Sequence, residues 1–273
     1  MRQAISLVEV LRADADPASP GTTHAEALKL QRLRCLLYVH ERYQAISEFR
    51  RPIIDERSVL LAEHDDNVPD GVLVGFNRVY ELFALLDDKF VDLWLDRSGD
   101  SKEAEGEQDS AWIRERSEQL SRDSDCARKD SSILTSAQFA DLSVTQSWIL
   151  SLFWRLALTR KLLVNDLPSA NSLSVRFPAE LVAQLRGSLS SLPSQAITMH
   201  GIGIAQKLFE VVDTVADLLI HTSASVHGLD DRAGGLLSTF DYLHRQIEGY
   251  RLDDTRLAIL RENNLENAHR FTE

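Results

Sequence analysis

The sequence predicts an all-α protein, a single multi-helix, bundle-like domain with a flexible acidic insertion. Apolar residues recur at spacings of three and four along most of the chain, which is typical of amphipathic helices and not of strands. A chain of 273 residues, 44% of them hydrophobic, can bury a large core without cross-links. Its two cysteines, Cys35 and Cys126, fit a reducing compartment and are too few for a zinc site built from paired cysteines.

Residues 1–96 are expected to supply the N-terminal helices of this domain. Thr22 or Thr23 can cap a first helix that must end before Pro52. Pro52 suits the first position of a second helix through IIDERSVLLAEH, and a break at VPDGVLVG precedes a third helix through FNRVYELFALLDDKFVDLWL. The apolar stripe of the first helix consists of Leu28, Leu33, Leu36, Leu37, His40, Tyr43 and Ile46.

Residues 97–132 differ from the rest of the chain because charged and small polar residues dominate them. Trp112 and Ile113 are the main large apolar residues of this segment. Ordering it would cost more entropy than its few contacts return, so we expect a mobile insertion with at most a short helix through Leu120. Residues 133–273 should then form the C-terminal helices of the same domain, at about 135–164, 200–221, 231–250 and 253–268, with Pro168 and Pro178 in the first connector.

The charge balance argues against nucleic acid as a partner. The formal net charge is −12, whereas binding to a phosphate backbone relies on clustered Lys and Arg. The densest basic cluster, Arg50, Arg51 and Arg57, is interleaved with acidic residues. The chain lacks the pattern of a secretory leader and any stretch of about 18 apolar residues, so we expect a soluble, intracellular, cytoplasmic protein without a membrane span.

An aspartate-rich segment, DDKFVD, contains Asp87, Asp88 and Asp92 and resembles the metal motif of class I terpene synthases. That resemblance implies magnesium held against a diphosphate by carboxylates on a helix. NDLPS, which begins at Asn165, is similar to the start of that family's other metal motif, but Leu173 stands where the family places an acidic ligand. The alternative is a solvated acidic turn and an Asn-Asp cap, and we expect no metal.

A second candidate lies in TMHGIGIAQKLFE, where His200 precedes two glycines at a predicted helix start. A histidine side chain can transfer protons near neutral pH, which would suit catalysis on an apolar substrate. The alternative is a histidine that caps a helix or packs in the core. The stripe Gln206, Glu210, Asp213 and Asp217 follows on the same helix, and we interpret it as a solvent-facing surface rather than as a set of functional carboxylates.

The third candidate is aromatic and cationic. Trp148 and Arg155 share one face of the predicted helix in SWILSLFWRLALTRKLL. An arginine within such an apolar run either reaches toward solvent, pairs with a carboxylate, or presents a forked donor to a ligand. We therefore propose Arg155 and His200 as catalytic residues. The expected substrate-binding residues are Trp148, Trp154, Arg176, Tyr43 and Phe83.

Several motifs resemble, in the same order, the C-terminal regulatory half of fungal zinc-cluster transcription factors. These motifs are the tryptophan-rich helix at 147–163, the R-F-P turn at 176–178, the H-G-I-G helix start at 200–203 and the K-L-F-E run at 207–210. The resemblance implies an all-helical regulatory domain. The zinc cluster and basic linker of that family are missing from the sequence, and RLDDTRLAIL stands where the family has a glycine- and arginine-rich segment.

Two classes of function follow. The first is a stand-alone helical domain that binds a hydrophobic small molecule and promotes a cofactor-free cyclisation or isomerisation in fungal secondary metabolism, by enclosing a reactive conformer. The second is an accessory of transcription that binds an effector or a partner without reading DNA. A magnesium-dependent terpene cyclase is a weaker third reading. The sequence has neither a G-x-S-x-G nucleophile motif nor a dinucleotide fingerprint, we expect no cofactor, and a homodimer is compatible with it.

Overall fold

The computed structural model describes residues 23–54, 61–96, 103–129 and 133–222, together with Tyr242 and Arg245. Within these residues the protein is all-α, as predicted, and an isolated bridge between Val164 and Ser174 is the only β-type pairing. The chain divides into two compact units, Met1–Ser98 with Ser132–Leu134, and Gly99–Ser131 with Thr135–Glu273.

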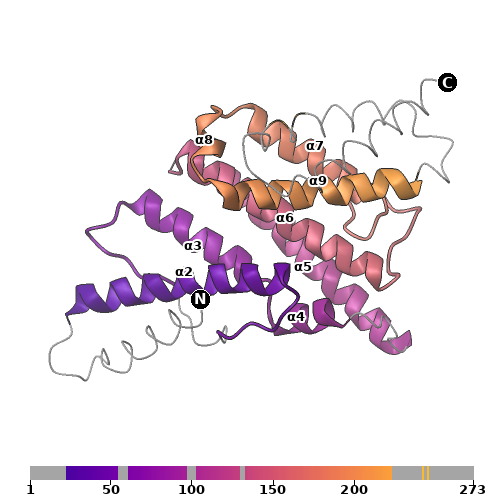
Figure 1. Ribbon diagram of the computed structural model, residues 1–273, viewed down its shortest axis with the longest axis horizontal. Helices are drawn as coiled ribbons and strands as arrows, with labels where there is room; N and C mark the ends of the chain where they lie inside the picture. The colour runs from indigo at the N-terminus through magenta and orange to yellow at the C-terminus, as the bar shows by residue number, and fades with distance from the viewer. Residues whose placement is uncertain are drawn as a thin grey trace. The chain divides into compact units, whose positions relative to one another are not determined.

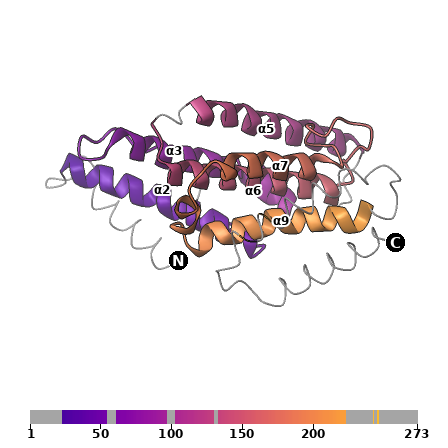
Figure 2. The same ribbon diagram turned by 90° about the horizontal axis from the view of Figure 1, so that it is seen from above.

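The first unit contains α2 (His24–Ser47), α3 (Asp70–Ala84) and α4 (Asp88–Leu95). Thr23 caps α2 in a capping box with Glu26, because each side chain accepts the other residue's backbone N–H. The helices α2 and α3 lie side by side (Figures 1 and 2). Between them, the rings of Tyr38 and Tyr80 stand 5.2 Å apart. Cys35 is fully buried on α2, and burial raises the pKa of its thiol to about 11, so it behaves as a small apolar residue.

Three expectations about this unit were wrong, the first being the break at VPDGVLVG, since α3 already begins at Asp70. The predicted second helix is absent at 52–54 and at 61–64, and its residues 55–60 lie outside the described part. Instead, two side chains hold the non-helical segment that begins at Leu61. Gln31 Nε2 donates to the Leu61 carbonyl at 2.7 Å, and Asn77 Nδ2 donates to the Ala62 carbonyl at 2.9 Å. The predicted third helix is two helices, because Asp87 Oδ1 accepts the Phe90 N–H at 2.9 Å and thereby caps a new helix.

The second unit is organised around α6 (Ser136–Thr159). This helix packs against α5 (Glu103–Lys129), α7 (Phe177–Ser190), α8 (Gln195–Thr198) and α9 (Ile202–Thr222), as Figure 2 shows for the three long partners. Thr135 caps α6 in a second capping box with Gln138. Every residue of α6 from Ser147 to Trp154 is buried, which explains why this stretch reads as nearly continuous apolar sequence.

The structure differs from the expectation of a mobile insertion at 97–132, because residues 103–129 of it form the helix α5. Ile113 and Leu120, seven residues apart, are fully buried, and the Trp112 ring lies 5.7 Å from that of Phe153 on α6. Apolar residues at that spacing suffice to dock one face of a helix most of whose other residues are polar or charged. Gln146 of α6 also donates its side-chain amide to the Leu120 carbonyl.

The connector predicted after α6 contains a helix that the sequence analysis missed. Pro178 sits in the first turn of α7, where the missing N–H has no cost. The helices predicted at 231–250 and 253–268 fall outside the described residues apart from Tyr242 and Arg245, both of which are helical. In the described part of the chain, no helix combines the length and apolar character that crossing a membrane requires.

Candidate functional site

The most distinctive polar arrangement of the second unit joins α6 to α9. We call it the polar seam and define it as Asp141, Thr145 and Trp148 of α6 with Lys207 and Glu210 of α9. The α6 residues follow one another at spacings of four and three, and the α9 residues at three, so each set occupies one helical face. Lys207 contacts Thr145, and three residues further along each helix Glu210 contacts Trp148. The two helices α6 and α9 therefore run parallel here.

Lys207 is the central cation of the polar seam. Its Nζ donates to Thr145 Oγ1 at 2.7 Å and lies 3.5 Å from Asp141 Oδ1, while its side chain is only 12% exposed. Burial lowers the pKa of this ammonium group, and the carboxylates of Asp141 and Glu210 act in the opposite direction. Since Thr145 also donates to Asp141 at 3.2 Å, these three side chains form a closed hydrogen-bonded triangle.

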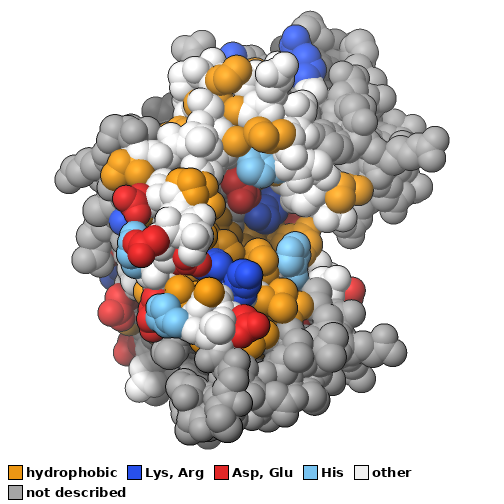
Figure 3. Space-filling model, turned by 90° about the vertical axis from the view of Figure 1, so that its left-hand side faces the viewer, with side chains coloured by type: hydrophobic (Ala, Val, Ile, Leu, Met, Phe, Trp, Pro, Cys, Tyr) orange, Lys and Arg blue, Asp and Glu red, His pale blue; other side chains and the backbone are white. Residues whose placement is uncertain are grey.

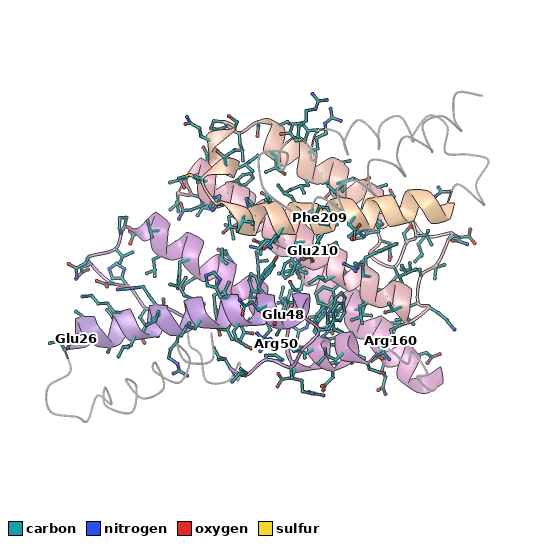
Figure 4. All side chains as sticks on the ribbon, viewed as in Figure 1. Glu26, Glu48, Arg50, Arg160, Phe209 and Glu210 are labelled. Atoms are coloured by element: carbon teal, nitrogen blue, oxygen red, sulfur yellow. The ribbon has the colours of Figure 1, made fainter. Side chains whose placement is uncertain are left out.

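Trp148 and Glu210 form the second contact of the polar seam. The indole Nε1 donates to Glu210 Oε2 at 2.6 Å, although the Trp148 side chain is fully buried and Glu210 is half-buried. Figure 4 labels Glu210 beside Phe209 on α9. A short hydrogen bond to a carboxylate fixes the rotation of the indole and the register of the two helices. The proposed substrate-binding role of Trp148 therefore competes with a contact inside the protein.

His200 lies just before α9, where the backbone turns at Gly201 with φ of +65°. Its Nε2 lies 2.8 Å from the Ala137 carbonyl of α6. A carbonyl oxygen only accepts hydrogen bonds, so Nε2 carries the proton and donates it. His200 thus fastens the start of α9 to the start of α6, one helical turn before Asp141. This contact gives His200 a partner inside the protein, and the catalytic role of His200 stays a prediction.

The remaining predicted residues of this unit are dispersed along α6 and α7. Trp154 is buried, and its Nε1 donates to the Ser174 carbonyl at 3.0 Å. Arg155 is half-buried on α6. Arg176 is exposed at the N-cap position of α7, and its backbone N–H donates to Ser174 Oγ at 3.2 Å. Ser174 therefore organises the turn around Trp154 and Arg176, which explains the R-F-P sequence as a helix start.

Tyr43 and Phe83, the other two predicted substrate-binding residues, belong to the first unit. Tyr43 is half-buried on α2. Phe83 is 1% exposed on α3, and its carbonyl lies 3.4 Å from the Tyr38 hydroxyl, which donates to it. Both residues pack within the first unit, and their role toward a substrate stays a prediction.

The aspartates of DDKFVD have partners within the first unit. Asp87 caps α4, Asp92 pairs with Arg51 at 2.8 Å, and Asp88 lies 3.9 Å from Arg42 Nη1. These contacts match the alternative of an acidic turn with a cap. Among the described residues, no group of three or more His, Cys, Asp or Glu side chains is arranged to hold a metal ion.

The sequence analysis missed Lys207, Thr145 and Asp141. Glu210 was named as part of a stripe that we interpreted as a solvent-facing surface. Of the stripe residues whose side chains are described, only Gln206 is exposed. The available signal was Lys207 itself, a cation inserted between Ala205 and Leu208, which are both buried. Chemically, the polar seam can hold two helices in one register and respond to protonation or to a ligand that competes for its hydrogen bonds.

Comparison with known proteins gives one distant relative. The chain is 24% identical over 230 residues to a probable sucrose utilization protein of Candida albicans. The match covers 84% of this chain and 44% of that protein, so the chain spans less than half the length of the curated relative it matches. No protein-family model matches the chain. No solved structure matches it either. The match to a fungal protein is compatible with the resemblance to a fungal regulatory domain.

Proposed function

We propose that this chain acts as a helical regulatory module that controls a fungal response to a nutrient by binding an effector or a partner protein, without reading DNA itself. The observation that carries the proposal is the match over most of the chain to a sucrose utilization protein. The motifs that resemble zinc-cluster regulators supply a second, independent support.

The polar seam gives those motifs a physical role. Hydrogen bonds from each of three motifs connect the start of α9 to α6. The residues involved are His200 of H-G-I-G, Lys207 and Glu210 of K-L-F-E, and Trp148 of the tryptophan-rich helix. Hydrogen bonds between polar side chains at a helix interface favour one helix register over its alternatives, and such contacts are a recognised device for a two-state element. An effector that weakens the seam would release α9 and change the surface offered to a partner.

The charge of the chain agrees with a role that does not involve DNA contact. The net charge is −12, and on the face drawn in Figure 3 acidic and basic side chains lie beside one another. Attraction to the phosphate backbone would require a patch of concentrated Lys and Arg. The cytoplasmic location expected from the sequence stays a prediction, because a regulatory module can act in the nucleus as well.

The experiment that tests the regulatory role is a tethering assay. The full chain is fused to a heterologous DNA-binding domain in yeast, and transcription of a reporter is measured in cells grown on sucrose or on glucose. We expect reporter activity to depend on the chain and to differ between the two sugars. Lys207→Met, which removes the charge and keeps the volume, should reduce that difference, whereas Lys29→Met on the exposed surface of α2 should leave it unchanged.

Two results would each contradict a part of this proposal. One is reporter transcription that is the same with and without the fused chain on both sugars. The other is an equal response in the Lys207→Met and Lys29→Met variants. The second result would leave a regulatory role but remove the polar seam from it.

A cofactor-free cyclase or isomerase is the second candidate, and the half-buried position of Arg155 favours it. Arg155 interrupts a stretch of α6 that is otherwise buried from Ser147 to Ala157, so a small movement could present its guanidinium to an apolar guest. The probe is all-trans-farnesol, followed by thermal denaturation and by chromatography of the extracted products. Two results together would support this candidate: farnesol raises the melting temperature of the wild type but not of Arg155→Met, and the wild type converts farnesol to a new product. Neither effect is expected of the regulatory module.

A further inference from the structure

Arg42 on α2 is the most unusual polar side chain of the first unit. It is fully buried, and none of its guanidinium nitrogens has a hydrogen-bond acceptor among the described residues. A guanidinium group stays charged at every pH that a folded protein tolerates, so it cannot relieve its burial by losing a proton. Buried charges are normally paired, and an unpaired one calls for an anion or water at that place.

The neighbours of Arg42 only partly compensate its charge. Its guanidinium carbon lies 4.9 Å from the centroid of the Tyr38 ring, which is a cation–π contact. Its Nη1 lies 3.9 Å from Asp88 Oδ1, which is too long for a hydrogen bond. The Asp88 side chain is 71% exposed. The guanidinium therefore lies directly beneath a carboxylate that faces solvent at the start of α4.

The carboxylate of Glu41, the residue before Arg42, is fully buried and makes its hydrogen bonds through Oε1, while its Oε2 has no partner among the described residues. Glu41 Oε1 accepts from Arg50 Nη1 at 2.8 Å and from the Ile53 backbone N–H at 3.0 Å. Arg50 in turn pairs with Glu48 at 2.9 Å, and Figure 4 labels these two residues at the end of α2. Arg50 thus engages Glu41 Oε1 and Glu48, and the donors of Arg42 have no acceptor among the described residues.

We propose that Arg42 anchors a binding site for a small monocarboxylate, which enters past Asp88 at the N-terminus of α4. The forked guanidinium matches a carboxylate with two parallel hydrogen bonds. The negative charges of Glu41 and Asp88 disfavour a ligand with more than one negative charge. The Tyr38 ring offers an apolar face to the body of an organic acid, and the amide groups at the start of α4 add favourable positive potential.

This site goes beyond the proposed regulatory role and does not depend on it, since it uses residues of the first unit and none of the polar seam. The nearest alternative is a simple ion pair in which Asp88 moves closer to Arg42. The two readings predict opposite effects of Asp88→Asn. Removal of a competing carboxylate strengthens the binding of an anion, whereas removal of a pairing carboxylate leaves the buried cation uncompensated.

The test is thermal denaturation and titration calorimetry of the full chain with sodium propionate, against sodium chloride of equal ionic strength. We expect propionate to raise the melting temperature, because a ligand that binds only the folded state stabilises it. Arg42→Met should lose the response, with binding at least tenfold weaker, and Asp88→Asn should bind more tightly than the wild type. Arg51→Met, which removes an exposed arginine from the same region, is the matched control and should respond as the wild type does.

Three outcomes would overturn the proposal. The first is an equal response of the wild type and Arg42→Met to propionate. The second is a lower melting temperature of Asp88→Asn with no response to propionate, which would establish the ion pair instead. The third is stabilisation by inorganic phosphate but not by propionate, which would exclude the monocarboxylate as the ligand.

Discussion

Lys207 Nζ of α9 donates a hydrogen bond of 2.7 Å to Thr145 Oγ1 of α6, and this contact places an ammonium group in the interior of the second unit. The residues next to this contact in the sequence, Leu208 on α9 and Val144 on α6, are fully buried. An amine in such a place exchanges hydration for two protein contacts, so both the stability and the protonation of the unit depend on it.

The first prediction concerns Lys207 and alkaline pH. Because its pKa is lowered on folding, the unfolded chain binds more protons than the folded chain in the range just below the usual lysine pKa, about 10.4. Lys207 should therefore make the free energy of unfolding increase as the pH rises through that range, by at most about 1.4 kcal/mol per pH unit. The measurement is urea unfolding of the wild type and Lys207→Met at a series of pH values, and their difference isolates this residue. Parallel pH curves would contradict the prediction.

The second prediction concerns the Trp148–Glu210 hydrogen bond. Trp148→Phe keeps a large ring but removes the donor, and Glu210→Gln keeps the shape but removes the charge. If the 2.6 Å contact stabilises the fold, the two changes together should cost less than the sum of the single changes, with a coupling of about 0.5 to 3 kcal/mol. Urea unfolding of the wild type, both single variants and the double variant completes the cycle. Strict additivity would mean that the contact contributes nothing.

The third prediction concerns acid stability of the first unit. The Asn67 backbone N–H and the Arg32 guanidinium hold the pKa of Asp65 at about 2, well below its usual range. The stabilisation is present above the ordinary pKa of about 4 and is lost as the pH falls through 2. The difference in melting temperature between the wild type and Asp65→Asn should therefore shrink as the solution is acidified from pH 5. Asp66→Asn, at an exposed position, should show no such trend.

The fourth prediction compares two glycines. A methyl group at Gly71 would stand 2.5 Å from the Ile133 carbonyl oxygen, whereas one at Gly187 would meet nothing within 4 Å. Gly71→Ala should destabilise the protein by about 1 to 3 kcal/mol, because backbone atoms must move. Gly187→Ala, in the last turn of α7, should stabilise it by about 0.5 kcal/mol, because alanine favours helix. Chemical denaturation of both variants decides, and equal effects at the two sites would contradict the packing argument.

Several features of the fold could be predicted because they rest on local rules. The threonine caps at Thr23 and Thr135 each require only a hydroxyl and an acid or amide side chain three residues later. The buried run of α6 is visible as apolar sequence without its neighbours. The break at Asp87 was missed because the apolar spacing there is that of one continuous helix. The capping hydrogen bond from the Phe90 N–H to Asp87 starts a second helix instead.

The candidate site was harder to predict. Residue type singled out His200, Trp148 and Glu210 in the sequence, but their partners lie more than 60 positions away. His200 contacts Ala137, and Trp148 contacts Glu210. No local pattern encodes such pairings. Lys207 was missed for the same reason: a lysine between apolar residues is expected to reach solvent unless the acceptors on a neighbouring helix are known.

The amino-acid sequence by itself determined that this protein is helical, where its two threonine-capped helices begin and that α6 carries a long apolar run, since these depend on spacing and on side chains within one or two turns. The tertiary structure alone decided that Lys207 is buried against Thr145, that α5 is a packed helix and that Arg42 is enclosed with no acceptor in the described part of the chain. Burial of a charge depends on what the rest of the chain places around it, and that information is not local.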